Sequence, residues 1–411
     1  MRERESLTQQ HVCMCVCVQK LGAGQFGAVY LIDSPLTIPE AEIALADGRT
    51  MTRPAVSHGS AAVKILHDTS AVTERDIDDF RREMSVLRGL HHPNILTLLG
   101  FSENARPLML ITEYADSSME SVLQRHVMLP LWRRLELAYD FAMSLEYLHS
   151  KQMIHRDLKP ANLLVVGVQS HFDMMVDNAS PSRTRPDDSI PLVSTARIRD
   201  RANEDIIKYL GHLEICDFGL TISTAASTSS EKEAVAPTGN TGSYRFMAPE
   251  VHRNEVYGEK ADIFSFGMIL YWIVDGQPPF TAHSGEEAAD LNASDSRPTF
   301  KTQRNVNVGT LGNTTGDTLS RAIKLVKQCW AANPKDRPNA TAICTSLEAA
   351  MKDCPRPAAA VAAAQKARQR WALLATRTRS SKFKHQKSAA STAYNDDTSF
   401  GDCLLGPCMQ Q

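Results

Sequence analysis

The eight residues from His155 to Asn162, with the sequence HRDLKPAN, bring a carboxylate, an ammonium group and a carboxamide close together in the chain. Phosphoryl transfer needs these groups: a carboxylate that orients the nucleophile and accepts its proton, cations that neutralise phosphate oxygens, and ligands for Mg²⁺. Asp157, Lys159 and Asn162 have the chemistry for these roles. A second carboxylate, Asp217 in the sequence DFG, follows a short apolar segment and can serve as a metal ligand.

Two elements nearer the N-terminus have the composition of a phosphate-binding site. The sequence GAGQFG at residues 22–27 lies between two predicted strands and not between a strand and a helix. This setting argues against a Rossmann dinucleotide site and suits a flap whose backbone N–H groups lie over nucleotide phosphates. Further along, Lys64 ends a short apolar strand, and Glu83 on the next predicted helix can supply its counter-charge. Such a pair would hold the ammonium group extended toward phosphate oxygens.

Hydrophobic periodicity predicts the elements that must position these residues. We expect strands at residues 12–20, 28–32, 61–66, 95–100, 108–112 and 213–216. We expect helices at residues 73–90, 131–149, 261–274, 319–331 and 340–350. Thr73 and Asp76 resemble a capping box at the start of the first helix. The helix at 261–274 is apolar on every side, which indicates a buried core helix.

Three segments interrupt this pattern, and a fourth differs from it in composition. Residues 33–60, rich in Pro, Ala, Gly and Ser, are predicted to form a long loop, as are residues 294–318. Residues 166–211 are polar and are predicted to be an insertion that splits two short apolar strands. The tail at 354–411 contains nine Lys or Arg residues and no acid between Pro355 and Ser388. We expect this tail to be largely disordered.

Composition narrows the class of protein. The 411 residues include 47 acidic and 45 basic ones, and a net charge of −2 gives no reason to expect nucleic acid as the main partner. Apolar runs stay well short of the ~20 residues that a membrane span needs. Nine cysteines without a C-x-x-C pair indicate thiols in a reducing compartment. We therefore expect a cytoplasmic protein, with the basic tail as a candidate nuclear signal.

From about residue 12 to residue 351, the sequence resembles the eukaryotic protein-kinase catalytic domain, whose glycine-rich, HRD, DFG and APE signatures it contains. The resemblance implies an α+β, bilobal fold for residues 12–353. Its N-lobe (12–115) would be small and mostly antiparallel β with one helix, and its C-lobe (116–353) larger and mainly helical. Residues 1–11 would then be an N-terminal extension.

The resemblance also implies the cofactors ATP and Mg²⁺ and a role for each motif. Asp157 would be the catalytic base, aided by Lys159, while Lys64 paired with Glu83 would orient ATP. Asn162 and Asp217 would bind Mg²⁺. The nucleotide would further contact the glycine-rich loop, its neighbouring strands and the first residues that follow them: Leu21, Gly22, Ala23, Gly24, Gln25, Phe26, Gly27, Ala28, Val29, Ala62, Thr112, Glu113, Ala115 and Leu164.

Finer features resemble the tyrosine-kinase-like group of serine/threonine kinases, which includes Raf-like and mixed-lineage kinases. These features are Lys159 in the sequence DLKP and the sequence TGSYRFMAPE at residues 241–250. The resemblance implies Ser/Thr-bearing protein substrates, a salt bridge between Glu250 and Arg337, and a buried Asp262 that anchors the catalytic loop. An upstream kinase acting on the hydroxyl-rich 220–243 loop would be a further partner.

Two other functions are disfavoured by the residues present. A pseudokinase scaffold would have lost Lys64, Asp157 or Asp217, and a small-molecule phosphotransferase would lack the APE sequence and Arg337; all are present. Two cysteine patterns also had alternatives. Alternation of Cys13, Cys15 and Cys17 with apolar residues favours a strand over a metal site. Cys216 is either a buried structural thiol or a reactive one that faces the nucleotide.

Overall fold

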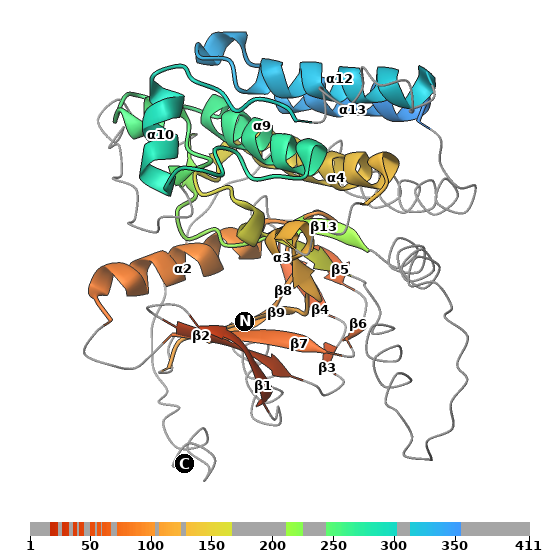
Figure 1. The fold of residues 1–411 in the computed structure, drawn as a ribbon. Helices are drawn as coiled ribbons and strands as arrows, with labels where there is room; N and C mark the ends of the chain where they lie inside the picture. Colours follow the sequence, from red (N-terminus) through yellow and green to blue (C-terminus); the bar gives the residue numbers. More distant parts are fainter. Residues whose placement is uncertain are drawn as a thin grey trace, which may run out of the picture. The chain divides into compact units, whose positions relative to one another are not determined.

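A computed structural model describes residues 17–23, 27–32, 36–38, 41–44, 50–53, 56–58, 60–66, 72–102, 107–124, 129–166, 211–224, 244–301 and 313–354. These residues form two compact units (Figure 1). The first unit contains the described residues up to Met84 and Thr97–Tyr114, and the second contains Ser85–Leu96 and the described residues from Ala115 onward. Strands dominate the first unit and helices the second, so the predicted α+β class is confirmed.

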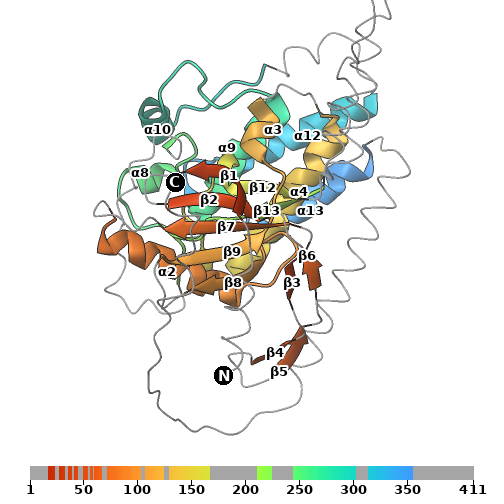
Figure 2. The same cartoon turned by 90° about the horizontal axis from the view of Figure 1, so that it is seen from below.

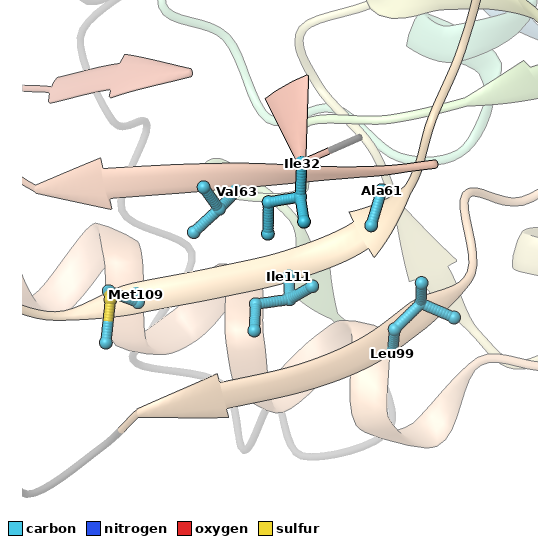
Figure 3. Close-up of a cluster of buried hydrophobic side chains, with 6 residues drawn as sticks. All are labelled: Ile32, Ala61, Val63, Leu99, Met109 and Ile111. Carbon is cyan, nitrogen blue, oxygen red and sulfur yellow. The ribbon is translucent and has the colours of Figure 1, made fainter. Parts of the chain in front are cut away.

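The first unit contains a five-stranded antiparallel sheet (Figure 2). In spatial order its strands are β1 (Cys17–Ala23), β2 (Gly27–Ile32), β7 (Ala61–Leu66), β9 (Met109–Glu113) and β8 (Leu98–Ser102). One face of the sheet carries a cluster of buried apolar side chains (Figure 3), formed by Ile32, Ala61, Val63, Leu99, Met109 and Ile111. Because side chains alternate along a strand, Ala62 and Lys64 of β7 point to the opposite face.

The predicted loop at 33–60 is wrong for its described residues, which form two further strand pairs. β3 (Leu36–Ile38) pairs with β6 (Val56–His58), and β4 (Ala41–Ala44) pairs with β5 (Thr50–Arg53). Both ladders are centred on the same sequence position, next to the dipeptide Asp47-Gly48 that is typical of hairpin turns. Both ladders lie between β2 and β7 in the sequence and form two separate two-stranded sheets.

Helix α2 (Glu74–Gly89) begins with the predicted capping box. The Asp76 carboxylate accepts hydrogen bonds from the Thr73 backbone N–H (2.8 Å) and hydroxyl (2.5 Å), and the Thr73 hydroxyl accepts one from the Asp76 N–H (3.3 Å). These bonds satisfy N–H groups that the first helical turn leaves without partners. The helix buries Ile77, Phe80 and Met84 along one stripe.

The second unit is built around four long helices: α4 (Leu131–Ser150), α9 (Lys260–Asp275), α12 (Asn313–Cys329) and α13 (Ala340–Lys352). Helix α9 lies against α4 and α12, and α13 lies against α4 and α12 (Figure 1). The expected burial of α9 is confirmed, because all but two of its residues are buried. Gly267 permits the close approach of α12, since a Cβ atom there would lie 2.7 Å from that of Cys329.

Three shorter helices of the second unit were not predicted: α3 (Met119–Gln124), α8 (Pro249–His252) and α10 (Gly285–Ala293). A capping box starts α10, with the Ser284 hydroxyl accepting from the Glu287 N–H and the Glu287 carboxylate accepting from the Ser284 N–H. The predicted loop at 294–318 is wrong in its last part, because α12 already starts at Asn313.

Short strands of the second unit frame the segments that carry the candidate residues. β12 (Leu163–Val166) pairs with β10 (Ser117–Ser118) on one side and β13 (His212–Ile215) on the other. β11 (Met153–Ile154) pairs with β14 (Ile222–Ser223). The predicted extension at 1–11, nearly all of the 166–211 insertion and nearly all of the 354–411 tail lie outside the described residues. In the described part of the chain, no helix is long and apolar enough to span a membrane.

Candidate active site

In the first unit, Lys64 and Glu83 form the expected ion pair, with Nζ 2.6 Å from Oε2. Strand β7 fixes the lysine backbone between Val29 of β2 and Leu110 of β9. The Glu83 side chain is only 6% exposed and that of Lys64 36%, so the carboxylate is buried behind its partner. The pair therefore presents one ammonium group in a fixed direction from the sheet face. Its action on a nucleotide stays a prediction.

Three other predicted nucleotide contacts share that sheet face with Lys64. Val29 lies directly opposite Lys64 in the β2–β7 ladder, and Thr112 lies directly opposite Ala62 in the β7–β9 ladder. Opposed residues of an antiparallel pair point to the same face, and so do residues two apart on one strand. Val29, Ala62, Lys64 and Thr112 thus line one face, on the reverse side from the apolar cluster.

The described parts of the glycine-rich segment lie in β1 and β2. Gly27 is sterically required, because a Cβ atom there would lie 2.6 Å from the Ile65 carbonyl oxygen. Gly22 pairs with Val29, and Ala23 pairs with Ala28. Leu21 is 41% exposed. Gly24, Gln25 and Phe26 lie outside the described residues.

The remaining predicted nucleotide contacts are divided between the two units. In the first unit, the Glu113 carboxylate accepts a hydrogen bond from the Thr97 N–H at 2.8 Å, so this side chain has a structural role. In the second unit, Leu164 lies on β12 opposite Ser118 and Glu214. Ala115, also in the second unit, lies outside the helices and strands.

In the second unit, Asp157 is the acceptor of two converging donors. Lys159 Nζ lies 2.7 Å and Asn162 Nδ2 lies 3.1 Å from the same oxygen, Oδ2. The Asn162 amide also donates to the Asp157 carbonyl at 2.9 Å, which holds the short helix η1 (Pro160–Asn162) against the aspartate. Both charged side chains are largely buried, so these hydrogen bonds fix the direction of the carboxylate.

Asp262 anchors the backbone of this segment, as expected. Its carboxylate accepts hydrogen bonds from the backbone N–H groups of His155 (2.9 Å) and Arg156 (3.0 Å), and His149 Nε2 lies 3.0 Å away. Burial acts to raise the pKa of Asp262, but the hydrogen bond from His149 and the contacts with His155 hold it below its ordinary value. The carboxylate therefore stays ionised and helps to hold Arg156 in the left-handed region (φ 75°), which costs free energy in a non-glycine residue.

His155 connects Asp157 to the segment that contains Asp217. Its Nδ1 accepts the Asp157 N–H at 3.3 Å, so the proton on Nε2 can be donated to the Cys216 carbonyl, 3.1 Å away. The half-buried Cys216 also donates its N–H to the Asn162 carbonyl at 3.0 Å. Asp217 follows with φ 65°, again a left-handed conformation. The structure thus brings the two predicted metal ligands, Asn162 and Asp217, onto hydrogen-bonded segments.

These two residues fit Mg²⁺. The Asn162 nitrogen is used by Asp157, which leaves the carboxamide oxygen to face away from it, and Asp217 adds carboxylate oxygens. Oxygen ligands from one or two side chains, completed by phosphates and water, are typical of Mg²⁺ sites. Among the described residues, no group of three or more His, Cys, Asp or Glu side chains could hold a metal by itself. Cys13 and Cys15 of the weighed cysteine pattern lie outside those residues.

The expected pair of Glu250 and Arg337 is present and bidentate, with N–O distances of 2.6 and 2.9 Å. Both side chains are almost completely buried. The remaining Arg337 donors bond to the carbonyl groups of Lys260, Ala331 and Ala332, so the buried charge is well satisfied. This pair fixes the start of α8 next to α9.

Sequence patterns did not predict the contacts of two residues near Arg156 and near the segment Ala248-Pro-Glu250. The Tyr257 ring lies 5.8 Å from the Arg156 guanidinium carbon. Arg245 donates hydrogen bonds to carbonyl groups that lie 34 to 38 residues further along the chain. Neither contact has a spacing or composition signal, since both depend on tertiary folding.

Comparison of the whole sequence with known proteins shows which family it is similar to. The sequence model of the family described as protein tyrosine and serine/threonine kinase matches residues 15–347. The serine/threonine-protein kinase VIK of Arabidopsis thaliana is 33% identical over 282 residues, which cover 68% of this chain and 52% of VIK. The dual specificity protein kinase shkA of Dictyostelium discoideum is 28% identical over 344 residues, covering 82% of this chain and 49% of shkA. The serine/threonine-protein kinase CTR1 of Arabidopsis thaliana is 28% identical over 347 residues, 82% of this chain and 32% of CTR1. The chain therefore spans about half or less of the length of these relatives.

Proposed function

The chain belongs to the protein tyrosine and serine/threonine kinase family, and we propose that it transfers the γ-phosphate of Mg-ATP to Ser and Thr hydroxyl groups of protein substrates. The arrangement around Asp157 is the main support: two donors converge on its carboxylate, and the buried Asp262 holds its backbone. This geometry suits a group that must meet a hydroxyl in one orientation.

In the proposed mechanism, Asp157 orients the substrate hydroxyl and accepts its proton. Lys159, 2.7 Å from Asp157, orients that carboxylate and adds positive charge beside it. Asn162 and Asp217 would hold Mg²⁺, which when bound neutralises charge on the phosphate oxygens. Lys64, extended by Glu83, would bind phosphate oxygens through its ammonium group.

Two observations favour Ser and Thr hydroxyls of proteins. Lys159 stands in the DLKP pattern of serine/threonine kinases, and two of the relatives above are named as serine/threonine kinases. The Glu250–Arg337 pair supports a platform for protein substrates, which small-molecule phosphotransferases lack. We propose residues 12–353 as the kinase domain, with lobes at 12–115 and 116–353 and with the extension and the basic tail outside it.

We also propose regulation by an upstream kinase. The candidate hydroxyl groups lie in the 220–243 loop, with Thr238 and Thr241 as the leading sites. Both threonines lie outside the described residues. A phosphate there would bring about −1.5 to −2 charges, which Arg156 beside Asp157 can bind.

The function is tested by phosphate transfer from radiolabelled Mg-ATP to myelin basic protein, casein and the enzyme itself. Lys64→Met and Asp157→Asn should each lower the rate at least about 100-fold, because several kcal/mol of transition-state stabilisation are lost. Matched controls are Lys324→Met on α12 and Asp78→Asn on α2, both exposed, and both should keep the wild-type rate. Phosphoserine and phosphothreonine should dominate the products.

Two results would count against this proposal. Wild-type enzyme that transfers no more phosphate than Asp157→Asn would contradict catalysis and favour a scaffold that only binds partners. Phosphotyrosine as the main product would contradict the Ser/Thr assignment alone.

A further inference from the structure

We propose that Arg245 is a positioning residue for protein substrates: it fastens the chain just before Ala248-Pro-Glu250 to the loop that leads into α10. The inference deepens the proposed function, since it assigns this residue to the binding of the protein substrate and not to ATP. It starts from the contacts of one side chain, all of which lie in the second unit.

The Arg245 guanidinium donates to three backbone carbonyl groups of the loop between α9 and α10. Nη1 lies 2.6 Å from the oxygens of both Pro279 and Phe280, and Nη2 lies 2.8 Å from that of His283. Phe280 has φ 51°, a left-handed conformation that directs the local backbone and costs free energy. A planar fork with several donors matches such a set of acceptors, whereas a lysine could satisfy only part of it.

Arg245 is half-buried and differs in kind from the fully buried Arg337 near this segment. Arg337 is neutralised by Glu250, whereas none of the described ion pairs involves Arg245. Burial lowers the pKa of Arg245, so the protein places a cation in a partly dehydrated position. The three carbonyl groups compensate for part of that cost, and they can do so only while the loop keeps its present form. The contact therefore couples the segment to the loop conformation.

The neighbours of Arg245 attach the same segment to the rest of the second unit. The Tyr244 ring contacts the ring of His252 edge-on, with centroids 6.5 Å apart, and His252 Nε2 lies 2.8 Å from Asp290 of α10. Phe246 stacks on Trp272 of α9, and its carbonyl accepts a hydrogen bond from Ser265. Tyr244 is thus connected through His252 to Asp290 in the middle of α10, and Phe246 packs on α9.

Arg245 attaches the same segment to the start of α10. The His283 carbonyl that it binds directly precedes Ser284, whose capping box begins that helix. Arg245 and His252 thus hold α10 at two points, the residue before its first turn and Asp290. Loss of Arg245 should let α10 shift relative to the residues before Ala248. The Asp157 segment is held by Asp262 and should keep its geometry.

The first test is steady-state kinetics with myelin basic protein as the probe substrate. Arg245→Met should raise KM for the protein about tenfold, equal to about 1.4 kcal/mol, with KM for ATP unchanged. Arg245→Lys, which keeps the charge but not the fork, should fall between Arg245→Met and wild type. The matched control is Arg321→Met on α12, whose partners Asp317 and Asp353 are exposed carboxylates; it should change neither KM. Equal effects on both KM values, or a fall in kcat alone, would overturn the proposal.

The second test is hydrogen exchange of wild type, Arg245→Lys and Arg321→Met, which needs no activity. Amides of residues 277–293 should exchange faster in Arg245→Lys than in the other two proteins, and those of α4 should not. Unchanged exchange at 277–293 would overturn the proposal even if the kinase is active. Inactive wild-type enzyme would contradict the proposed function, while the exchange result would still decide the role of Arg245 as a fastening of α10.

Discussion

Asp140 lies on α4 and Asp262 on α9 faces His149 of α4, but the pKa values of their carboxyl groups shift in opposite directions. Asp262 is bonded by two backbone N–H groups and faces His149, which together outweigh its burial. Asp140 accepts a hydrogen bond from the Leu213 N–H at 3.2 Å. Burial therefore dominates and raises its pKa to about 6, against smaller opposing effects from Leu213, Arg133 and His212. The number of donors decides whether a buried carboxyl keeps its charge.

The raised pKa of Asp140 predicts a pH-dependent stability. The folded chain holds this proton up to about pH 6, whereas an unfolded Asp loses it near its ordinary pKa of 3.8. The stabilisation is thus fully present below the unfolded pKa and is lost as the pH rises through the folded pKa. Between about pH 5 and about pH 8, wild type should lose about 1 kcal/mol of unfolding free energy relative to Asp140→Asn. Urea unfolding at several pH values measures this difference.

The control for this experiment is Asp78→Asn, on an exposed position of α2. Its stability difference from wild type should stay constant over the same range. If the difference between wild type and Asp140→Asn is also flat, or if it changes with the opposite sign, the assigned titration of Asp140 is wrong.

At the same scale, residue patterns predict side chains that are close along the chain, the family resemblance predicts several distant pairs, and neither predicts contacts with backbone carbonyl groups. The HRDLKPAN segment predicts the contacts of Asp157 with Lys159 and Asn162, because only a few residues separate them. The pair Lys64–Glu83 was expected from the resemblance and is present. The partners of Arg245 are backbone carbonyl groups, and any residue type can supply a carbonyl. No sequence pattern therefore predicts that contact.

Among the elements, the long helices were predictable and the strand pairs at 36–58 were not. Helices α2, α4, α9 and α13 match their predicted ranges to within about two residues, since each buries a long apolar stripe or surface. The strands β3 to β6 have only three or four residues each, and Pro39 and Pro54 interrupt their alternation. Short strands with prolines between them have the composition of a loop. Their pairing depends on the neighbouring β2–β7 hairpin.

Helix α10 was missed for a different reason. Its Ser284 and Glu287 have the spacing of a capping box, which is a usable signal. The helix itself is short and buries mostly alanines, so its apolar stripe is weak. Attachment to Arg245 and His252 supplies tertiary contacts that periodicity cannot reveal.

The register of β12 and β13 predicts that the insertion at 166–211 is dispensable for chemistry. Val166 lies directly opposite His212, so the two strands already face each other where the insertion begins and ends. Replacing residues 167–210 by one Asn would leave the two-residue turn Asn-Gly211, which favours hairpins. Gly211 stays in place, because Arg133 bonds to its carbonyl. The shortened enzyme should fold with equal or higher thermal stability and keep its rate within about threefold, since loop length adds only about 0.6 kcal/mol per doubling.

Circular dichroism and phosphate transfer together test this replacement. Replacing the same residues by Val, with Gly211→Val, removes the turn residues and should lower the melting temperature. A correctly folded Asn-Gly211 variant without ATP turnover would show that the insertion takes part in the reaction.

At the scale of the whole molecule, the two units hold different parts of the proposed machinery. The first unit contains Lys64, Glu83 and the glycine-rich segment, and the second contains Asp157, Asn162 and Asp217. Each half is organised within its own unit, by the β7–α2 ion pair in one and by Asp262 in the other. The chain spans about half or less of its relatives, so the sequence similarity addresses these two units and not the remainder of those proteins.

A nucleotide bound as proposed, through Lys64 and through Mg²⁺ at Asp217, should stabilise the chain against unfolding. A non-hydrolysable ATP analogue with Mg²⁺, at about 100 times its Kd, should add about 2.7 kcal/mol to the unfolding free energy of wild type. Lys64→Met in the first unit and Asp217→Asn in the second should each remove most of this gain, because each deletes a proposed contact with the nucleotide or its metal. Removal of Mg²⁺ by EDTA should weaken the gain in wild type and leave Asp217→Asn nearly unchanged.

Lys324→Met, an exposed control on α12, should respond as wild type does. Thermal unfolding at increasing concentrations of the analogue measures the gain in stability for wild type and the three variants. If Lys64→Met kept the full gain while Asp217→Asn lost it, the nucleotide would depend on the second unit alone, and the assignment of Lys64 to phosphate binding would have to be abandoned.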